Sequence, residues 1–502
     1  MSAHVVIIGG GIAGLAAMEQ LRTQAPALRV TLLEALDRVG GHIRTDREGG
    51  YVMEAGPDVF LAAKPWAMAL CRKLGIADRI VGTSAAVKGS LVLRQGRLVP
   101  VPDGMSGLVP ARIAPFVVTR LLSPLAKLRV GLEYLLAPRL SDDDESVEQF
   151  VVRRLGREMY DRLLEPLLSG IFAGDGRKLS MAAAFPQLRE QERRHGGLLR
   201  GVLAARCVKA PAAVPSHVPT GLVSLQGGLG VLVEALEGMH AVTVDGSRHR
   251  SIRRGTRVEQ ITPTAGGGYT IVVAGGETIH ADAVIVAAPA YAAAPLLRTV
   301  DATLATLLTE IQYASTVTVS VTFRSSAIRT LPRGTGYTVP RAEGRSVLAC
   351  TFASSKFADR APAGRTMFRF FLGGAGRGDF VDRCNGELRS IVRAELRDVL
   401  GVTATPELVR INRLPRAMPQ YAVGHLTLLA RIDACLSSRP SLALAGAAYR
   451  GVGIPDCIRS GEAAADRALA ALPDADLRQS VAMPPSFSLP PLTDRASRSL
   501  PT

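Results

Sequence analysis

The stretch His4-Val-Val-Ile-Ile-Gly9-Gly-Gly11-Ile-Ala-Gly14 stands near the start of the chain and decides how the fold is interpreted. Its four consecutive apolar residues predict a buried strand, and the apolar run after Gly11 predicts a helix. Gly9 permits a tight turn, Gly11 lets the backbone approach a pyrophosphate, and Gly14 lets the helix pack on the strand. Free amides at the helix start favour an anion. The stretch therefore predicts the dinucleotide-binding turn of a Rossmann-like α/β domain.

An acidic residue and a glycine doublet follow this turn. Glu34 lies twenty residues after Gly14 and closes a second apolar strand, where a carboxylate can accept the adenosine ribose hydroxyls. Gly40 and Gly41 add backbone amides just past that strand, which suits the longer reach of FAD. An ordinary loop with two glycines is the alternative interpretation of the doublet.

Composition and charge set the outer bounds. With 502 residues, 47% of them hydrophobic and 21% charged, the chain is globular and long enough for two or three domains. The net charge of +16 suggests an anionic partner, namely nucleic acid, a membrane surface or an acidic small molecule. We expect no nucleic-acid partner, because the sequence carries no zinc-ligand spacing, helix-turn-helix or RNA-binding pattern. A solvated, arginine-rich surface is the alternative explanation of the charge.

The cysteines and the first apolar run bear on location. No CxxC pair occurs, so we expect neither a metal nor a redox-dithiol site, and reduced thiols fit a cytoplasmic protein. We expect no signal peptide, because the first apolar run is the nucleotide-binding strand itself. The six cysteines are Cys71, Cys207, Cys350, Cys384, Cys435 and Cys457.

A leucine-rich segment, residues 108–136, predicts contact with a membrane surface. Prolines and four basic residues interrupt it, so we do not expect it to span a bilayer. Its leucines are predicted to share one helical face, and a basic amphipathic helix can lie in the membrane interface. A helix that buries these leucines in its own domain is the alternative. The leucines are Leu121, Leu122, Leu125, Leu128, Leu132, Leu135 and Leu136.

Further motifs carry a resemblance to a known family. They are Gly56-Pro57-Asp58-Val59, Glu165-Pro-Leu-Leu-Ser169-Gly170, Pro419-Gln420-Tyr421 and Gly451-Val-Gly453-Ile454-Pro455-Asp-Cys457. With the first glycine turn they resemble the oxygen-dependent porphyrinogen oxidases of haem biosynthesis, in the flavin monoamine-oxidase superfamily. The resemblance runs from residue 4 to about 470.

The resemblance implies an interleaved fold of three parts and a terminal tail. A Rossmann-like FAD-binding domain would comprise 1–85, 221–295 and 425–472. Residues 86–220 would form a helical, membrane-associating domain and part of the substrate domain. The rest of the substrate domain, 296–424, would be built on a mainly antiparallel sheet, which the alternating pattern of 316–323 also predicts. We expect 473–502 to be a disordered tail, because it is rich in proline and serine.

The resemblance also implies which residues contact a non-covalent FAD. Val258 would contact adenine through its backbone, and Gly453, Ile454 and Pro455 would lie near the flavin ring. The remaining implied FAD contacts are Gly9, Gly11, Gly14, Glu34, Gly40, Gly41, Gly56, Pro57, Asp58 and Val59.

The implied reaction is the six-electron oxidation of coproporphyrinogen III or protoporphyrinogen IX. Hydride would pass from the meso carbons to the flavin, and dioxygen would reoxidise it with release of hydrogen peroxide. The catalytic protein residues stay unknown, since the flavin carries the chemistry. Lys88 is the candidate anchor for a substrate propionate. Implied partners are the porphyrinogen, dioxygen, an anionic membrane surface on the inner face of the cell membrane and the next enzyme of haem synthesis.

Three other interpretations remain open at this stage. An amine oxidase would share the FAD scaffold, but such enzymes typically carry an acid in the closing motif, and 445–448 has none. A carotenoid desaturase would lack the Ser169-Gly170 and Pro-Gln-Tyr motifs. A catalytically silent flavoprotein scaffold would keep the fold and make no porphyrin.

Overall fold

A parallel sheet forms the centre of the nucleotide-binding side of the molecule. The computed structural model describes residues 3–85, 87, 89–106, 109, 110, 112–139, 141–207, 221–241 and 250–473. Five parallel strands lie in the order β12-β2-β1-β16-β22. They are β1 (His4–Ile8), β2 (Arg29–Leu33), β12 (Arg250–Arg253), β16 (Ala283–Val286) and β22 (Leu442–Leu444). β1 and β16 are buried along their whole length, because both faces of the sheet are covered.

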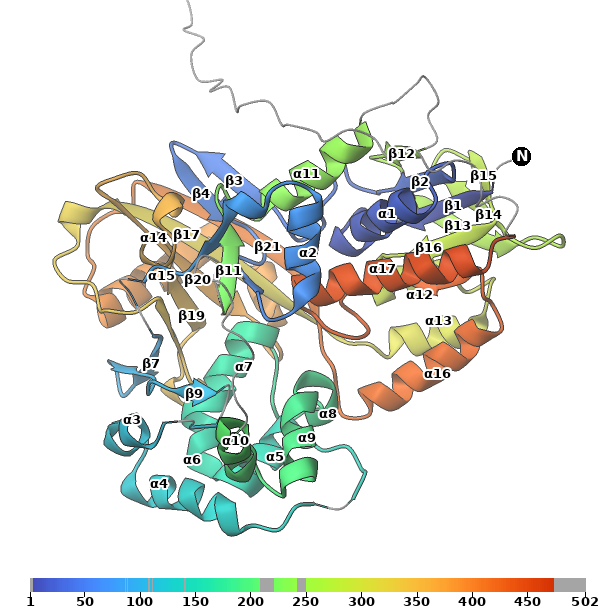
Figure 1. Cartoon of the computed structure of the whole chain (residues 1–502). Helices are drawn as coiled ribbons and strands as arrows, with labels where there is room; N and C mark the ends of the chain where they lie inside the picture. The colour runs from blue at the N-terminus through green and yellow to red at the C-terminus, as the bar shows by residue number, and fades with distance from the viewer. Residues whose placement is uncertain are drawn as a thin grey trace, which may run out of the picture.

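Helices from the two ends of the chain pack together on one face of this sheet. Helix α1 (Ile12–Gln24) lies beside α17 (Ile454–Ala470), as the blue and red helices of Figure 1 show. At their crossing a Cβ on Gly461 would stand 2.1 Å from the carbonyl oxygen of Ala13, so only glycine fits. The nucleotide turn and the closing motif are therefore neighbours in space.

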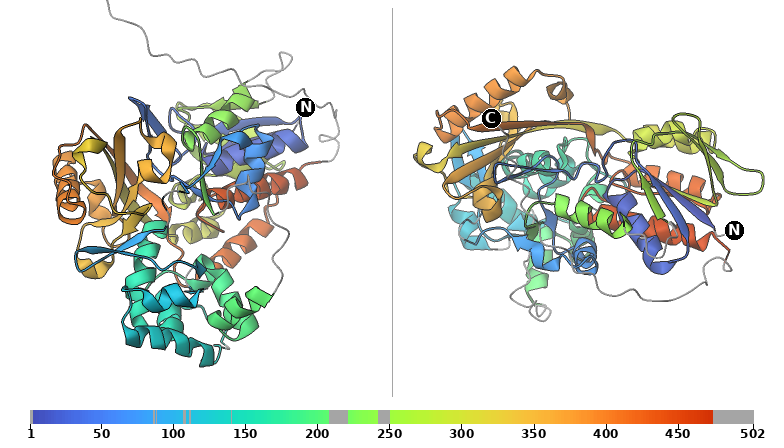
Figure 2. Two further views of the ribbon diagram at one scale, coloured as in Figure 1. Left: turned by 60° about the vertical axis from the view of Figure 1, so that its left-hand side comes forward. Right: turned by 90° about the horizontal axis from the view of Figure 1, so that it is seen from above.

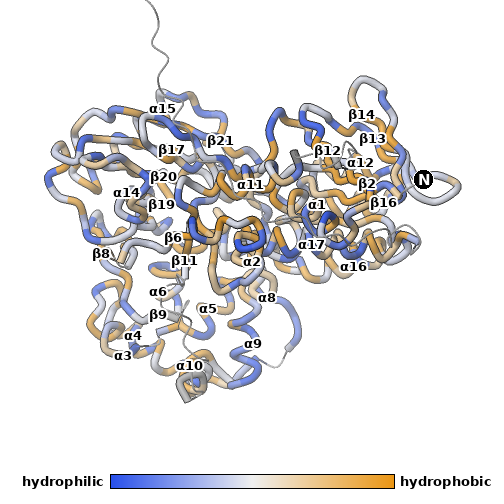
Figure 3. Tube along the Cα trace, turned by 45° about the horizontal axis from the view of Figure 1, so that its top comes forward, coloured by the Kyte–Doolittle hydropathy of each residue, from blue (hydrophilic) through white to orange (hydrophobic). Residues whose placement is uncertain are grey.

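The opposite face of the parallel sheet is covered by a small antiparallel sheet and three helices. Much of the tube through this whole region is coloured as hydrophobic in Figure 3. The covering elements are β13 (Val258–Pro263), β14 (Tyr269–Val273), β15 (Thr278–Ala281), α12 (Ala290–Leu296), α13 (Ala302–Thr309) and α16 (His425–Ser437).

A second, mixed sheet dominates the other side of the molecule. Its order is β21-β17-β20-β19-β18-β7-β8, and every neighbouring pair is antiparallel except β18 and β7. Residues 86–220 thus supply two strands to a sheet whose other strands come from 313–419. The strands are β7 (Leu91–Arg94), β8 (Arg97–Pro100), β17 (Tyr313–Arg324), β18 (Gly336–Thr338), β19 (Val347–Phe352), β20 (Arg365–Gly373) and β21 (Leu408–Pro419).

The two faces of the mixed sheet differ in chemistry. The valines and phenylalanines of β17 and β20 on one face pack against α15 (Asn385–Leu400). The other face carries Thr318, Ser320 and Thr322 and meets the hairpin of β3 (Thr45–Glu48) and β4 (Tyr51–Glu54). We call this second face the polar face.

Three short strands form a separate small sheet on the nucleotide-binding side, and two further helices share its apolar core. β11 (Leu222–Leu225) joins β5 (Phe60–Leu61) to β6 (Ile80–Gly82). The helices are α2 (Pro65–Lys73) and α11 (Gly230–Ala241).

A helical region projects from the two sheets, at the bottom of Figure 1 and of the left view of Figure 2. Its own apolar core joins most of these helices. The longer helices are α3 (Ile113–Val118), α4 (Pro124–Gly131), α5 (Val147–Leu155), α7 (Glu165–Phe172), α9 (Pro186–His195) and α10 (Leu198–Cys207). Shorter pieces are a 3₁₀ turn (Leu132–Leu135), α6 (Arg157–Met159), a π-helical turn (Tyr160–Leu164) and α8 (Met181–Ala184).

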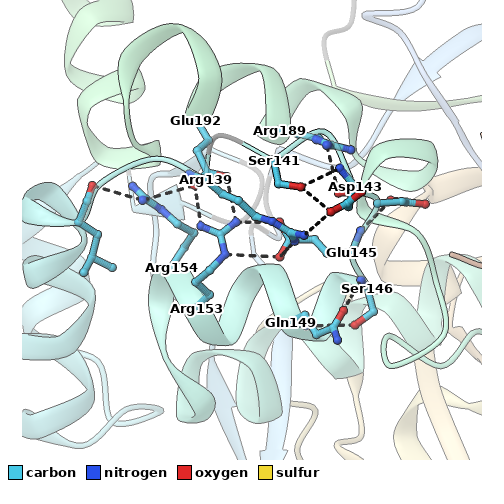
Figure 4. A network of polar contacts seen from close by, with 12 residues as sticks. Arg139, Ser141, Asp143, Glu145, Ser146, Gln149, Arg153, Arg154, Arg189 and Glu192 are labelled. Atoms are coloured by element: carbon cyan, nitrogen blue, oxygen red, sulfur yellow. Dashed lines mark hydrogen bonds and ion pairs between the residues drawn. The ribbon is translucent and has the colours of Figure 1, made fainter. Parts of the chain in front are cut away.

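Buried ion pairs hold the helical region together (Figure 4). Arg154 and Glu133 are both fully buried and form an ion pair. Arg153 donates to Glu192 at 2.6 Å and to Glu145 at 2.7 Å. Removing one partner of such a pair leaves an uncompensated buried charge, which is strongly destabilising. The region therefore has a rigid interior of its own.

The leucine segment is not the single helical face that the sequence predicts. Pro124 begins a new helix, and the Ser123 hydroxyl caps it by accepting from the amide of Ala126 at 3.2 Å. Leu121 and Leu122 precede this break and are buried in the core of the helical region. Of the leucines after it, Leu136 is half-buried and four are exposed, namely Leu125, Leu128, Leu132 and Leu135.

Candidate functional site

Two glycines of the first turn are required by the fold itself. Gly9 has a φ of +109°, and a Cβ there would lie 2.8 Å from the carbonyl oxygen of Ala287. A Cβ on Gly14 would lie 2.0 Å from the carbonyl oxygen of Gly9. These two positions bring α1 close to β1, and a side chain at Gly14 has no space.

Gly11 is different, because it faces open space. A Cβ at Gly11 would meet no atom within 4 Å. Gly11 is also the N-cap of α1, and no side chain caps the helix there. The uncapped amides at this helix start therefore face a space that an anion can fill.

The glycine doublet lies directly against this turn. Gly40 pairs with Gly11 in a short parallel bridge, and its amide donates to the carbonyl of Gly10 at 2.7 Å. A Cβ on Gly41 would lie 3.2 Å from the Cα of Gly11. The two glycine motifs thus form one surface of backbone.

Two arginines border that surface, and the sequence analysis did not select them. Arg38 donates to the carbonyl of Gly41 at 2.9 Å. Burial lowers the pKa of the Arg38 guanidinium, and the nearby charge of Arg44 lowers it further. Two neighbouring guanidinium groups favour a phosphate-bearing ligand, which would separate their charges. Their positions beside Gly40-Gly41 in the sequence are the signal that could have identified them.

Glu34 stands at the end of β2, as predicted, and already holds the turn. Its carboxylate accepts from the amide of Gly10 at 2.7 Å and from the amide of Leu36 at 2.8 Å. Its backbone pairs with Arg253 and Thr256, which brings the following strand and the buried Val258 to the same edge. A carboxylate with two oxygens has further acceptor capacity for a ribose hydroxyl.

The Gly56-Pro57-Asp58-Val59 motif lies between the glycine turn and the mixed sheet. A Cβ on Gly56 would lie 2.0 Å from the carbonyl oxygen of His42, directly after the glycine doublet. Asp58 accepts from Nζ of Lys356 at 3.0 Å. Burial alone would raise the pKa of the Asp58 carboxyl, but the charges of Lys356 and Arg369 outweigh it and lower that pKa.

The closing motif forms the start of α17. Gly453 is the N-cap, no side chain caps it, and Ile454 and Pro455 occupy the first turn. Asp456 forms an ion pair with Lys64 at 2.6 Å. The Tyr421 hydroxyl donates to the carbonyl of Ala447 at 2.6 Å and accepts from the amide of Gly451 at 2.7 Å. The helix start is therefore fixed by tyrosine and lysine contacts from distant segments.

Two other motifs join the helical region to the mixed sheet. Glu165 accepts from Nε and from the amide of Arg341, each at 3.0 Å. The amide nitrogen of Gln420 donates to the carbonyl of Phe172 at 3.0 Å. These contacts therefore link the helical region directly to the mixed-sheet side of the molecule.

The described residues fit a flavin dinucleotide. Gly11 faces open space at an uncapped helix start, Glu34 has spare acceptor capacity beside it, and no side chain caps the start of α17. Lys88, the predicted propionate anchor, lies outside the described residues.

Comparisons with known proteins identify the family of the chain. A sequence model of flavin-containing amine oxidoreductases matches residues 12–469. The chain is 36% identical to coproporphyrinogen III oxidase of Bacillus subtilis, over 93% of this chain and 98% of that protein. It is 32% identical to the chloroplast protoporphyrinogen oxidase 1 of Arabidopsis thaliana, over 90% of this chain and 85% of that protein.

A solved structure also matches the chain over most of its length. A protein of Exiguobacterium sp. 255-15, described as a protoporphyrinogen oxidase, aligns with a TM-score of 0.80 and 32% identity. The alignment covers 93% of this chain and 98% of that one. The interleaved arrangement of the two sheets and the helical region is thus shared over nearly the whole length.

Proposed function

The chain belongs to the family of flavin-containing amine oxidoreductases, and from this we propose that it is an FAD-dependent oxidase of coproporphyrinogen III. The observation that carries the proposal is the 36% identity to a coproporphyrinogen III oxidase over 93% of the chain. The Gly-Ile-Pro-Asp-Cys form of the closing motif and the net charge of +16 favour the substrate with more carboxylates.

Bound FAD supplies the redox chemistry, namely acceptance of hydride from the meso carbons and delivery of electrons to dioxygen. The six electrons and six protons that leave the porphyrinogen reduce three dioxygen molecules to three hydrogen peroxide molecules. The chain binds and orients. The amides at Gly11 and Gly41 would hold the diphosphate, Glu34 the ribose, and the positive end of α17 would favour negative charge on the ring.

Side-by-side turnover of two substrates tests the proposal. Purified protein should convert coproporphyrinogen III to fluorescent porphyrin faster than protoporphyrinogen IX, and peroxide should accumulate in proportion. Neither product should form without dioxygen. Faster turnover of protoporphyrinogen IX would reassign the substrate. Bound FAD without any porphyrin or peroxide would identify a silent flavoprotein, and turnover of amines alone would identify an amine oxidase.

We further propose that the exposed leucines place the protein on the inner face of the cell membrane. Leu125 and Leu135 are 78% and 71% exposed in the helical region, and Lys127, on the same helix as Leu125, donates to the carbonyl of Val117 at 2.5 Å. The core and ion pairs of that region are complete without them, so their exposure does not serve folding. Among the described residues, no helix is both long and apolar enough to cross a bilayer.

Liposome sedimentation tests this location. Wild-type protein should sediment with anionic vesicles and less so at high salt, because basic residues near the surface contribute about 1 kcal/mol each. A Leu125→Ser/Leu128→Ser variant should stay in the supernatant and keep FAD. Leu203→Ser, at an exposed leucine of another helix, is the control. Unchanged sedimentation of the double variant would refute the membrane surface, and self-association that it abolishes would assign the leucines to a dimer.

A further inference from the structure

The polar face of the mixed sheet is buried, yet many of its side-chain atoms lack a partner. Within the described part of the chain, unpartnered buried atoms gather on this face and on the hairpin opposite it. Polar groups of this kind are normally satisfied, because an unpaired buried donor costs free energy. The residues concerned are Arg44, Tyr51, Ser320, Thr322, Arg369, Arg410 and Asn412.

Arg369 is the most unusual of these residues. It lies in the centre of β20, opposite Ser320 on one side and Thr351 on the other, and is 3% exposed. Its guanidinium donates to the carbonyls of Ala55, at 3.2 Å, and Gly56. Its Nε and Nη1 have no hydrogen-bond partner in the described part of the chain.

The neighbouring charges leave Arg369 without a carboxylate of its own. Glu54 accepts from the amide of Leu229 and the hydroxyl of Thr45, each at 2.7 Å. Asp58 pairs with Lys356 at 3.0 Å. Among the described residues, none places a carboxylate within 4.0 Å of the Arg369 guanidinium, whereas Lys356 has one. The charges of Asp58 and Glu54 act on the Arg369 guanidinium from farther away, because Asp58 pairs with Lys356 and Glu54 lies closer to Arg360.

The position of this charge is informative. The Ala55–Gly56 carbonyls that it binds begin the Gly-Pro-Asp motif, and Gly56 lies against His42, beside the glycine doublet. The guanidinium thus lies directly behind the backbone that we assign to the FAD site. In a water-poor interior, a fixed charge acts strongly on any charge that develops nearby.

We propose that Arg369 is a positioning residue of the flavin site, whose buried charge, directly paired with no carboxylate of the described residues, stabilises the negative charge that the flavin gains on reduction. The proposal rests on the flavin site described above. It assigns to Lys356 a supporting role, because Lys356 pairs with Asp58 and so leaves Arg369 without that carboxylate as a direct partner. The register of the sheet makes the arrangement possible, since Ser320, Arg369 and Thr351 share one face.

The midpoint potential of bound FAD, measured without substrate, tests the inference. Arg369→Met should lower that potential and lower kcat, with KM for the porphyrinogen unchanged. Arg369→Lys keeps the charge and should restore most of both. Arg365→Met is the matched control, because Arg365 lies on the same strand but pairs with Glu407 at 3.1 Å near the surface. An unchanged potential in Arg369→Met with FAD bound would overturn the inference.

A second variant covers loss of FAD from Arg369→Met. Lys356→Met leaves the Asp58 charge unbalanced and should lower the potential as well, so an unchanged potential there would overturn the inference. Absence of FAD from the wild-type protein would instead refute the proposed function. The two failures are therefore distinguishable.

Discussion

The glycine turn after β1 and the polar face of the mixed sheet serve the same site by different means. The turn presents backbone amides, and its residues lie within 9–14, so a short motif specifies it. The polar face presents side chains, and its neighbours Ser320, Arg369 and Arg410 come from three separate strands. Backbone recognition is local in sequence, whereas side-chain recognition depends on strand register.

The two regions should therefore fail differently when mutated. A side chain added in the turn either clashes with the backbone, as at Gly14, or enters open space, as at Gly11. A change on the polar face acts through one hydrogen bond or one charge. The expected losses of stability or cofactor therefore differ in size between variants, and the largest is expected in the turn.

The largest effect is expected for Gly14→Val. Its Cβ would stand 2.0 Å from the carbonyl oxygen of Gly9, where α1 cannot move away from β1 without disrupting the central strand of the parallel sheet. We expect a loss of stability above about 4 kcal/mol, which is exceptional for a single change. Yield of soluble protein and thermal unfolding measure it. A folded variant with wild-type stability would show that α1 can move away from β1.

Gly11→Val should fold and lose its cofactor. No atom lies within 4 Å of the new Cβ, and the φ of −67° suits any L-residue, so the apo-protein has no strain. The side chain instead occupies the space assigned to the pyrophosphate. We expect near wild-type thermal stability of the apo-protein and no visible flavin absorbance. Full retention of FAD would remove the diphosphate from this turn.

Elements that depend on contacts between residues close in sequence could be predicted from the sequence. The Gly9 and Gly14 positions and Glu34 are set by backbone contacts inside one strand-turn-helix unit, so the spacing was sufficient. The capping box of Ser146 and Gln149 has an equally local cause, with the Ser146 hydroxyl accepting from the amide of Gln149 at 3.1 Å.

Two features were missed or mistaken, and only the first of them has a long-range cause. Arg369 gave one signal, an arginine within the aromatic run Phe368-Arg-Phe-Phe371, but its neighbours depend on pairing with β17 and β19. The leucine segment was treated as one helix, although Ser123 and Pro124 form a helix start in its middle. Here the local signal was present, and the hydrophobic period concealed it.

A moderate effect is expected on the polar face from Thr318→Val. The Thr318 hydroxyl donates to the carbonyl of Ala55 at 3.0 Å, and valine has nearly the same shape. Because Arg369 still donates to the same carbonyl, we expect a loss of about 1 kcal/mol in the free energy of unfolding and no loss of FAD. Chemical denaturation measures it, with Thr306→Val at an exposed threonine as control. A loss as large as that of Gly14→Val would mean that the polar face, and not the turn, fixes this side of the fold.

The smallest effect is expected at the start of β1, whose first residue, His4, is buried. Its Nδ1 donates to the carbonyl of His280 at 2.8 Å, and in the neutral ring its Nε2 accepts from the Thr31 hydroxyl at 2.9 Å. Burial lowers the pKa of His4, the charge of Arg29 lowers it further, and the His280 carbonyl and Asp282 only partly oppose this.

The sign of the pH dependence follows from that lowered pKa. The unfolded chain binds a proton at His4 near pH 6.5, while the folded protein binds it only at lower pH. Unfolding therefore takes up a proton between the two values, so stability is complete above about pH 6.5 and declines as the pH falls. Denaturation at a series of pH values should show a weaker decline in His4→Gln than in the wild type, whereas His195→Gln, at an exposed histidine, should follow the wild type. An identical slope in His4→Gln would mean that His4 keeps its proton on folding, which would contradict the lowered pKa of the buried ring.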